Sequence, residues 1–394
     1  MRLALITLPD VDDVELASFA EEHGFGAFYV GENPLMWSSS AVALALAAQR
    51  TERIHLGSGV AIAGLHHPAA TAQAMATINR LAPGRVSCGV GTGNSAMRVL
   101  GRDPMSVRAY ERYVAVLAAL LHGEEATVGE GEDERVLSWM VPAERGYASF
   151  DPPVPLYVSA FGPRSMAIAG RYGDGILSYL GATAEQVEAA WEPLEAGAAA
   201  AGRTLDRETF FTSSMLMMCV LRDGEDPDSP RIRAQAAPVA MLTVHYCYEQ
   251  FKQLGTPPPP FLESIWDEYV AAVEAVPTAR RGLRIHRGHG EWVPEEDRRF
   301  VTTELLQSTC MIAPGAEIAA QLRSLATANL DEVAINPSPE TSREVIEDIH
   351  REVLPHLWLS DAQPVRSGRA PSTHKRPPGP STSGRTPARD IDHA

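Results

Sequence analysis

Short apolar segments that resemble β-strands alternate with segments of helical periodicity along most of this chain, and no other feature limits its fold as strongly. The strand-like segments are rich in β-branched and aromatic residues, whereas apolar residues recur every three or four positions in the helical segments. The eight predicted strands are residues 2–7, 27–31, 54–62, 86–91, 156–160, 175–179, 210–221 and 332–336. The predicted helices are residues 11–23, 39–49, 68–81, 107–121, 163–172, 184–201, 317–328 and 342–353.

Alternation of this kind is typical of an α/β protein with a parallel sheet and crossover helices. The predicted strands are mostly continuous in their apolar character, as strands buried on both faces are. Eight such units in one chain of 394 residues favour a single closed (β/α)8 barrel, the TIM barrel, over an open doubly wound sheet. The open sheet stays the alternative until the motifs are considered.

Two stretches interrupt the alternation. Residues 123–153 look irregular, and residues 230–299 contain four consecutive prolines together with histidines and tryptophans. Insertions into a barrel usually belong to the loops that build and cover its active site. We therefore expect one domain over residues 1–360, with 230–299 as an insertion covering the active-site face before the last βα unit. Residues 361–394, rich in Pro, Ser and Arg, are predicted to form a disordered tail.

The net charge of −16 disfavours nucleic acid and anionic membranes as partners, because both need a basic surface. Apolar runs all fall short of the roughly 20 uncharged residues of a membrane span, and the amino terminus lacks a signal-peptide pattern. The cysteines are widely separated and form no C-x-x-C pair, which argues against a disulfide framework or a zinc ribbon. We expect a soluble, cytoplasmic protein that binds a small-molecule substrate.

The active site of a (β/α)8 barrel lies at the carboxyl ends of its strands, so the residues after each predicted strand are candidates. After the second strand come the polar pair Glu32 and Asn33 and, on a proline-stiffened loop, Trp37. Such a group could hydrogen-bond a substrate and stack on a planar ring. A helix cap beside an ordinary buried tryptophan explains the same residues, and residue types alone favour this second reading.

Glycines mark the ends of the next strands. The third predicted strand contains two glycines, one before Ser58 and one after it. They predict that a ligand or a neighbouring backbone approaches closely at the segment Ser58, Gly59 and Val60. The turns after the fourth and fifth strands lead into helices, whose amino termini suit phosphate, although simple capping turns fit equally well. The first turn comprises Gly91, Thr92, Gly93, Asn94 and Ser95. The second comprises Ser159, Ala160, Phe161, Gly162 and Arg164.

Four histidines occur in two close pairs, His66 with His67 and His286 with His289. They lack an HExxH motif, a carboxylate at ligand spacing and a cysteine cluster, so we predict no metal site and expect loop or capping roles. The chain also lacks a G-x-S-x-G elbow, a P-loop and a Ser-His-Asp signature, which leaves hydrolase and NTPase functions without a positive signal.

Several ordered motifs resemble the luciferase-like flavin-dependent oxidoreductases, in particular the branch that uses coenzyme F420. The most specific motifs are residues 51–60 (TERIHLGSGV), 67–69 (HPA) and 81–93 (LAPGRVSCGVGTG). Residues 155–163 (PLYVSAFGP), 173–176 (GDGI) and 331–337 (DEVAINP) resemble the fifth, sixth and last strands of that family. The resemblance covers residues 2–181 and 314–357 and implies a (β/α)8 barrel.

The resemblance implies a cofactor ring over the bulge in the third strand, where members of the family carry a non-prolyl cis peptide that maps onto Gly59 and Val60. Their phosphate contacts would fall on residues 91–95 and 159–164. The implied reaction is hydride transfer between F420 and a small organic substrate. An FMN-dependent monooxygenase, which uses reduced flavin and O2, is the close alternative, and a cofactor-free binding paralogue is a third. The family also implies a homodimer and a separate flavin or F420 reductase where the cofactor is reduced elsewhere.

Two positions depart from the F420-dependent glucose-6-phosphate dehydrogenases, which resemble this chain at Trp37. Those enzymes have a histidine where this chain has Asn33 and a glutamate where it has Asn94, so glucose 6-phosphate is not expected as the substrate. The Asn94-Ser95 pair is more similar to the Asp-Ser of methylenetetrahydromethanopterin reductases. Because asparagine cannot act as a general acid at physiological pH, the candidates for proton transfer are Glu32, His66, His67, His286 and His289. Several arginines flank the proposed cofactor loops. They could contact the acidic oligoglutamate tail of F420 or could simply be solvated side chains on helix faces: Arg80, Arg85, Arg98, Arg102 and Arg164.

Overall fold

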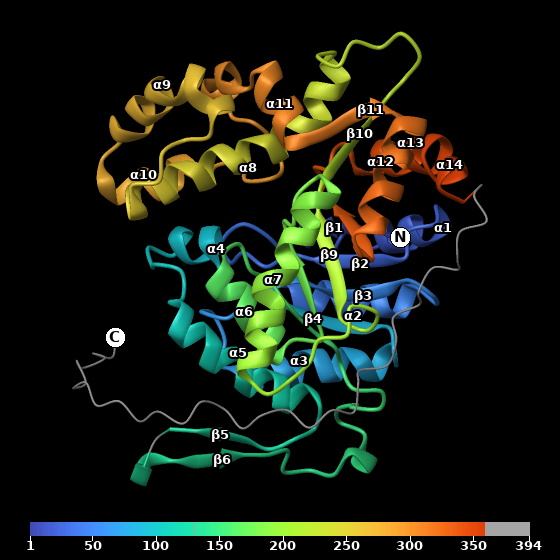
Figure 1. The fold of residues 1–394 in the computed structure, drawn as a ribbon, viewed down its shortest axis with the longest axis vertical. Helices are drawn as coiled ribbons and strands as arrows, with labels where there is room; N and C mark the ends of the chain where they lie inside the picture. The colour runs from blue at the N-terminus through green and yellow to red at the C-terminus, as the bar shows by residue number, and fades with distance from the viewer. Residues whose placement is uncertain (130, 359–394) are drawn as a thin grey trace.

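The computed structural model describes residues 1–129 and 131–358. Eight parallel strands close into a barrel, in the order β1-β12-β9-β8-β7-β4-β3-β2, and the helices surround it (Figure 1). The barrel strands are β1 (Arg2–Thr7), β2 (Ala27–Val30), β3 (His55–Ile62), β4 (Val86–Gly91), β7 (Leu156–Val158), β8 (Gly175–Ser178), β9 (Phe211–Met215) and β12 (Glu332–Ile335). The predicted (β/α)8 barrel is therefore confirmed. The predicted tail, residues 361–394, lies outside the described residues.

Crossover helices follow the barrel strands and bury their apolar faces against the sheet. In α5 the residues Tyr110, Val114, Leu117 and Leu121 recur at helical spacing and are all buried, as an amphipathic helix on a barrel requires. The crossover helices are α1 (Glu15–Glu22), α2 (Ser40–Arg50), α3 (Pro68–Leu81), α5 (Val107–Leu121), α6 (Pro163–Tyr172), α7 (Ala184–Ala200), α12 (Gly315–Thr327) and α13 (Ser342–Glu352). Two short helices, α4 (Asn94–Val99) and α14 (Leu354–Trp358), complete this part.

The prediction of one strand over residues 210–221 is wrong. Strand β9 ends at Met215, and a second strand, β10 (Met217–Leu221), pairs outside the barrel with β11 (Cys310–Pro314). In the barrel, β12 pairs with β9 only as far as Met215, opposite Ala334. The chain beyond that point needs another neighbour for its backbone N–H and C=O groups. A segment 93 residues later in sequence supplies it, which periodicity within residues 210–221 cannot reveal.

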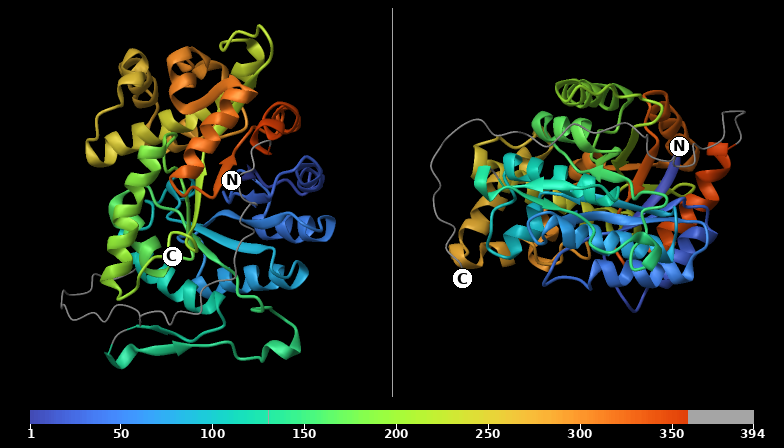
Figure 2. Two further views of the ribbon diagram at one scale, coloured as in Figure 1. Left: turned by 45° about the vertical axis from the view of Figure 1, so that its right-hand side comes forward. Right: turned by 90° about the horizontal axis from the view of Figure 1, so that it is seen from below.

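Both stretches that interrupt the predicted alternation contain regular structure. Residues 123–153 include an antiparallel hairpin of β5 (Ala126–Val128) and β6 (Arg135–Leu137), with short 3-10 turns at η1 (Gly131–Asp133) and η2 (Ala143–Arg145). This hairpin lies at the end of the molecule opposite to the helices of the insertion (Figures 1 and 2).

The insertion is mostly helical. It contains α8 (Pro230–Leu254), η3 (Pro260–Leu262), α9 (Glu263–Glu274), α10 (Thr278–Ile285) and η4 (Glu295–Phe300), and α11 (Thr303–Thr309) follows it. Helix α8 begins where the Ser229 side chain accepts a hydrogen bond from the Ile232 amide at 3.2 Å, and it ends at Gly255, which has a φ of 70°. Among the helices of the described ranges, α8 included, none combines the length and apolar character that crossing a bilayer requires.

Candidate active site

The register of the barrel brings the predicted site loops together. Strand β2 pairs with β3, β3 with β4, and β4 with β7, all in parallel, so the segments after their carboxyl ends are neighbours. The β3–β4 register shifts between Ser58 and Ala61, and the peptide between Gly59 and Val60 is cis. The family resemblance predicted a bulge and a cis peptide at Gly59 and Val60, and the structure has both at that position.

The first glycine turn is tightly packed. Gly93 has a φ of 80° and precedes α4, and a Cβ added there would lie 2.3 Å from Ile62 Cγ2. Only glycine fits this backbone without strain. Helix α4 has six residues, so few peptide dipoles align in it and its amino terminus attracts an anion weakly.

The second turn is the stronger candidate for a phosphate. Helix α6 has ten residues and carries Pro163 at its first turn, and a Cβ added at Gly162 would meet no described atom within 4 Å. An open backbone at a helix amino terminus is the usual anion-binding arrangement. Arg164 is exposed in this first turn, and the Phe161 ring is 56% exposed beside it.

Hydroxyl groups around these turns serve the scaffold. Ser58 Oγ donates to the Gly89 carbonyl at 2.8 Å and is buried, so its side chain is already used inside the barrel. Tyr110 Oη lies 2.6 Å from the Val90 carbonyl and 3.1 Å from the Ser159 carbonyl. Tyr110 thus ties together the ends of β4 and β7, a role that the sequence analysis missed because Tyr110 reads as an apolar position of α5.

Glu32 and His66 form a polar pair at the ends of β2 and β3. His66 Nε2 lies 2.8 Å from Glu32 Oε1, and Glu32 Oε2 accepts the Ile62 amide at 2.7 Å. The hydrogen bond to Glu32 raises the pKa of His66 above its ordinary value of 6.5, against the effect of burial. His66 therefore keeps its proton to a higher pH than a free imidazole does. Its neighbour His67 has a local role, since its Nδ1 accepts the Ala69 amide at the start of α3.

Replacing Glu32 with glutamine is expected to lower the pKa of His66 toward 6.5. Because the folded-state pKa is raised, the stability from this pair is present below pH 6.5 and is lost as the pH rises through the raised value. The His66 side chain is 46% exposed, which limits this contribution to about a few tenths of a kcal/mol. Glutamine keeps an oxygen for the Ile62 amide. NMR titration of the imidazole resonances, with exposed His356 as the internal control, measures the shift, and an unchanged His66 pKa contradicts the pairing.

Two asparagines at the barrel mouth are buried or half-buried with unsatisfied side chains. Asn33, at 2% exposure, has no partner among the described residues for either Nδ2 or Oδ1. Asn336 Oδ1, directly after β12, is likewise unpartnered within the described ranges. Buried polar atoms almost always have a hydrogen-bond partner, and those that do not often await a ligand or water. Asn33 thus offers both a donor and an acceptor for a bound molecule.

The insertion contacts these loops through side chains that the sequence analysis did not single out. Trp37 Nε1 donates to Glu291 Oε1 at 2.9 Å, and the Asn94 amide donates to Glu249. The rings of Phe161 and Tyr246 lie 5.7 Å apart. These partners come from α8 and from the segment after α10, so only the tertiary structure brings them to the barrel.

A cleft of about 390 Å³ opens between α4, α8 and α10. Its lining includes the cations Arg98, Arg102, Lys252 and Arg281 and the carboxylates Asp103 and Glu249. The lining carries more cations than carboxylates, and Glu274, outside it, pairs with Lys252 at 2.9 Å and with Arg281 at 2.8 Å. Two of the arginines proposed for an acidic tail, Arg98 and Arg102, thus lie in one cleft. Arg85 does not, because it donates to the Ile54 and Thr51 carbonyls before the start of β3.

Comparison with known proteins agrees with this architecture. Residues 11–332 match the family model described as luciferase-like monooxygenase. An F420-dependent glucose-6-phosphate dehydrogenase of Beutenbergia cavernae is 34% identical over 226 residues, which is 54% of this chain and 63% of that protein. Limonene 1,2-monooxygenase of Rhodococcus erythropolis is 34% identical over 215 residues, 52% of this chain and 54% of that protein. The matched region thus spans less than two thirds of the length of these two relatives.

Other relatives match along nearly the whole chain. A 5,10-methylenetetrahydromethanopterin reductase of Archaeoglobus fulgidus is 25% identical over 368 residues, 91% of this chain and 100% of that protein. Among solved structures, the F420-dependent tetrahydromethanopterin reductase of Methanopyrus kandleri superimposes with a TM-score of 0.65 at 22% identity, covering 90% of this chain and 99% of that one. The predicted membership is confirmed by the family model: this chain belongs to the luciferase-like monooxygenase family.

Proposed function

We propose that this protein is an oxidoreductase that transfers a hydride between coenzyme F420 and a small organic substrate. The observation that carries the choice of F420 is the cationic cleft beside the first glycine turn. Its lining has four cations against two carboxylates, and it begins at Arg98, four residues after Asn94. An acidic oligoglutamate tail matches such a surface, whereas FMN ends at a single phosphate.

The residues present fit a phosphate-bearing ring cofactor. The open backbone at Gly162 and the amino terminus of α6 suit its phosphate. The bulge at Val60 would support its ring, and the unsatisfied Asn33 amide could hydrogen-bond the ring or a substrate carbonyl. The deazaflavin supplies the hydride chemistry when bound, and the protein binds, orients and excludes water.

Proton transfer falls to the Glu32–His66 pair in this proposal. Asn33 and Asn94 cannot exchange protons at physiological pH, and the raised pKa of His66 keeps its ring protonated further into the neutral range. In the direction of reduction, the His66 imidazolium would donate a proton to the substrate oxygen or nitrogen next to the carbon that accepts the hydride, with Glu32 holding the ring in place. In the direction of dehydrogenation, the neutral His66 ring would accept that proton as the carbon releases the hydride.

An FMN-dependent monooxygenase remains the second candidate. Limonene 1,2-monooxygenase shares as high an identity with this chain as the dehydrogenase does, and oxygenation by a reduced flavin would need a separate reductase partner. For either reaction we also propose a homodimer, the commonest closed assembly, which light scattering on the purified protein tests.

Equilibrium binding of F420 and of FMN to the full chain separates the two functions. We expect F420 to bind more tightly, and Arg102→Glu or Lys252→Glu to weaken F420 binding by about 10–100-fold, because each removes a charged contact worth about 1.5–3 kcal/mol. FMN binding should change little in the same variants. Arg298→Glu, at an exposed cation of η4 outside the cleft, is the matched control. Tight FMN binding with no effect of the cleft variants on F420 would reject the proposal, and failure to bind either cofactor would favour a binding paralogue.

A further inference from the structure

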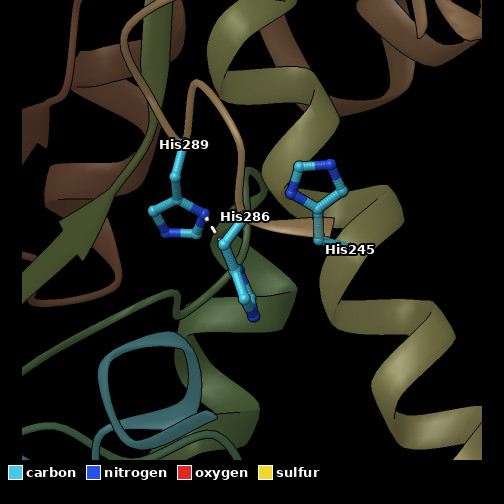
Figure 3. A group of neighbouring side chains, drawn as sticks. All are labelled: His245, His286 and His289. Carbon is cyan, nitrogen blue, oxygen red and sulfur yellow. Dashed lines mark hydrogen bonds between the residues drawn. The ribbon is translucent and has the colours of Figure 1, made fainter. Parts of the chain in front are cut away.

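Three histidines of the insertion meet in the folded protein. His245 lies on α8, and His286 and His289 lie in the segment directly after α10 (Figure 3). One ring nitrogen of each lies within 4.8 Å of the others. His245 and His286 are 5% and 3% exposed, and His289 is half-buried. Sequence spacing did not predict this group, because His286 lies 41 positions after His245.

The orientation of His286 is that of a metal ligand with a supporting carboxylate. Its Nδ1 faces His289 Nδ1 at 3.4 Å. Its other nitrogen, Nε2, lies 2.9 Å from Glu249 Oε1, although the two atoms do not form a hydrogen bond of regular geometry. In metal sites a histidine ligand typically presents one nitrogen to the ion and the other to a carboxylate, which holds the ring in place. Glu249 is itself held by the Asn94 amide.

His245 adds an independent observation. Its Nδ1 is buried and has no hydrogen-bond partner in the part of the chain that the structure describes. Leaving a buried polar atom without a hydrogen-bond partner costs about 1–3 kcal/mol. A ligand bound to this nitrogen would remove that cost. The His245 ring lies 6.1 Å from the His289 ring and 6.2 Å from the His286 ring, measured between centroids.

Burial also affects the charge of two of these rings. Burial lowers the pKa of His245 well below its ordinary value, with repulsion from the other two imidazoles adding to the effect. Burial also lowers the pKa of His289 to about 3.

We propose that His245, His286 and His289 bind one divalent transition-metal ion, with Zn²⁺ as the reference ion, and that Glu249 positions His286. Three imidazoles with an open fourth position are an established donor set for zinc, and imidazole also suits copper, iron and nickel. Ligand nitrogens about 2.0–2.1 Å from a tetrahedral ion lie roughly 3.4 Å apart. The 3.4 Å between the two Nδ1 atoms already meets this spacing, whereas the His245 ring would have to rotate to bring its nitrogen to the ion.

The ion would connect the insertion to the barrel. His289 lies beside Trp37, with 6.2 Å between the ring centroids, and Glu249 reaches Asn94. Metal binding would therefore order α8 and the segment after α10 against the loops that follow β2 and β4. This role does not depend on which cofactor the barrel binds.

The test is direct metal binding to the full chain after treatment with a chelator. Competition with a chromophoric chelator should show one Zn²⁺ bound per chain, and Co²⁺ should give the visible absorption of a tetrahedral site. His245→Ala and His289→Ala should each weaken Zn²⁺ binding by about 100-fold or more, and Glu249→Gln by about 10–100-fold. His356→Ala, at an exposed histidine of α14, should bind as the wild type does.

Other outcomes overturn the proposal. Wild-type protein that binds no Zn²⁺ saturably would mean that the three histidines only pack against one another. Binding that survives in a His245→Ala/His289→Ala double variant, or that falls equally in His356→Ala, would place the ion elsewhere. His289→Ala is the safest variant for folding, because His289 is half-buried, and its circular dichroism and thermal unfolding should match those of the metal-free wild type. Titration with F420 in the absence of metal tests the proposed function separately.

Discussion

Replacement of Glu332 with alanine is expected to lower the free energy of unfolding by about 3–5 kcal/mol, because it would leave the charge of a buried partner uncompensated. Glu332 is fully buried at the start of β12 and faces Arg2, the first residue of β1, in the register of the barrel. Arg2 Nε lies 2.5 Å from Glu332 Oε2, and Ser213 Oγ donates to Glu332 Oε1 at 2.8 Å. The pair closes the barrel between its first and last strands, with Arg2 also donating to Tyr29 Oη at 3.0 Å.

Urea unfolding followed by circular dichroism measures this loss. Glu347→Ala, at an exposed position of α13, is the control and should change the free energy by no more than about 0.5 kcal/mol. Glu332→Gln removes the charge but keeps the hydrogen-bonding atoms and should fall between the two. A loss below about 1 kcal/mol in Glu332→Ala would mean that water or a rearranged Arg2 compensates for the missing carboxylate.

Replacement of Gly93 with alanine is expected to weaken cofactor binding by about 100-fold, the loss that a misplacement of roughly 1 Å causes in a preorganised site. The added Cβ would lie 2.3 Å from Ile62 Cγ2 and 3.0 Å from Met97 Cγ, in a residue whose φ is 80°. The turn must therefore shift, and the backbone amides of Asn94 and Ser95 shift with it.

Gly202→Ala is the matched control for this variant. Gly202 has a φ of 69°, but a Cβ there would meet no described atom within 4 Å. Both variants carry the cost of a left-handed backbone, about 1 kcal/mol, whereas only Gly93→Ala adds the clash beside the cofactor loops. Fluorescence titration with F420 and FMN compares them. Equal affinities in the two variants would show that the first glycine turn does not touch the cofactor.

The periodicity of apolar residues was sufficient to predict the strands and helices whose structure depends on their own residues. All eight barrel strands overlap predicted segments, because a buried parallel strand and an amphipathic helix differ in periodicity and length. The cis peptide and bulge at Gly59 and Val60 followed from motif resemblance rather than from pattern. The insertion escaped prediction in detail, since α8 carries Pro238 in its interior and buries residues on several sides, which blurs a helical stripe.

The sequence by itself determined the barrel, the family and the loops at which a cofactor is expected, because each of these depends on periodicity or on contiguous motifs. Only the tertiary structure decided the partners of those loops. The pairing of β10 with β11, the contacts of Trp37 with Glu291 and of Asn94 with Glu249, and the three-histidine group join residues far apart in the chain. Such contacts depend on how distant parts of the chain pack against one another. The spacing of residues within a short segment carries no information about that packing.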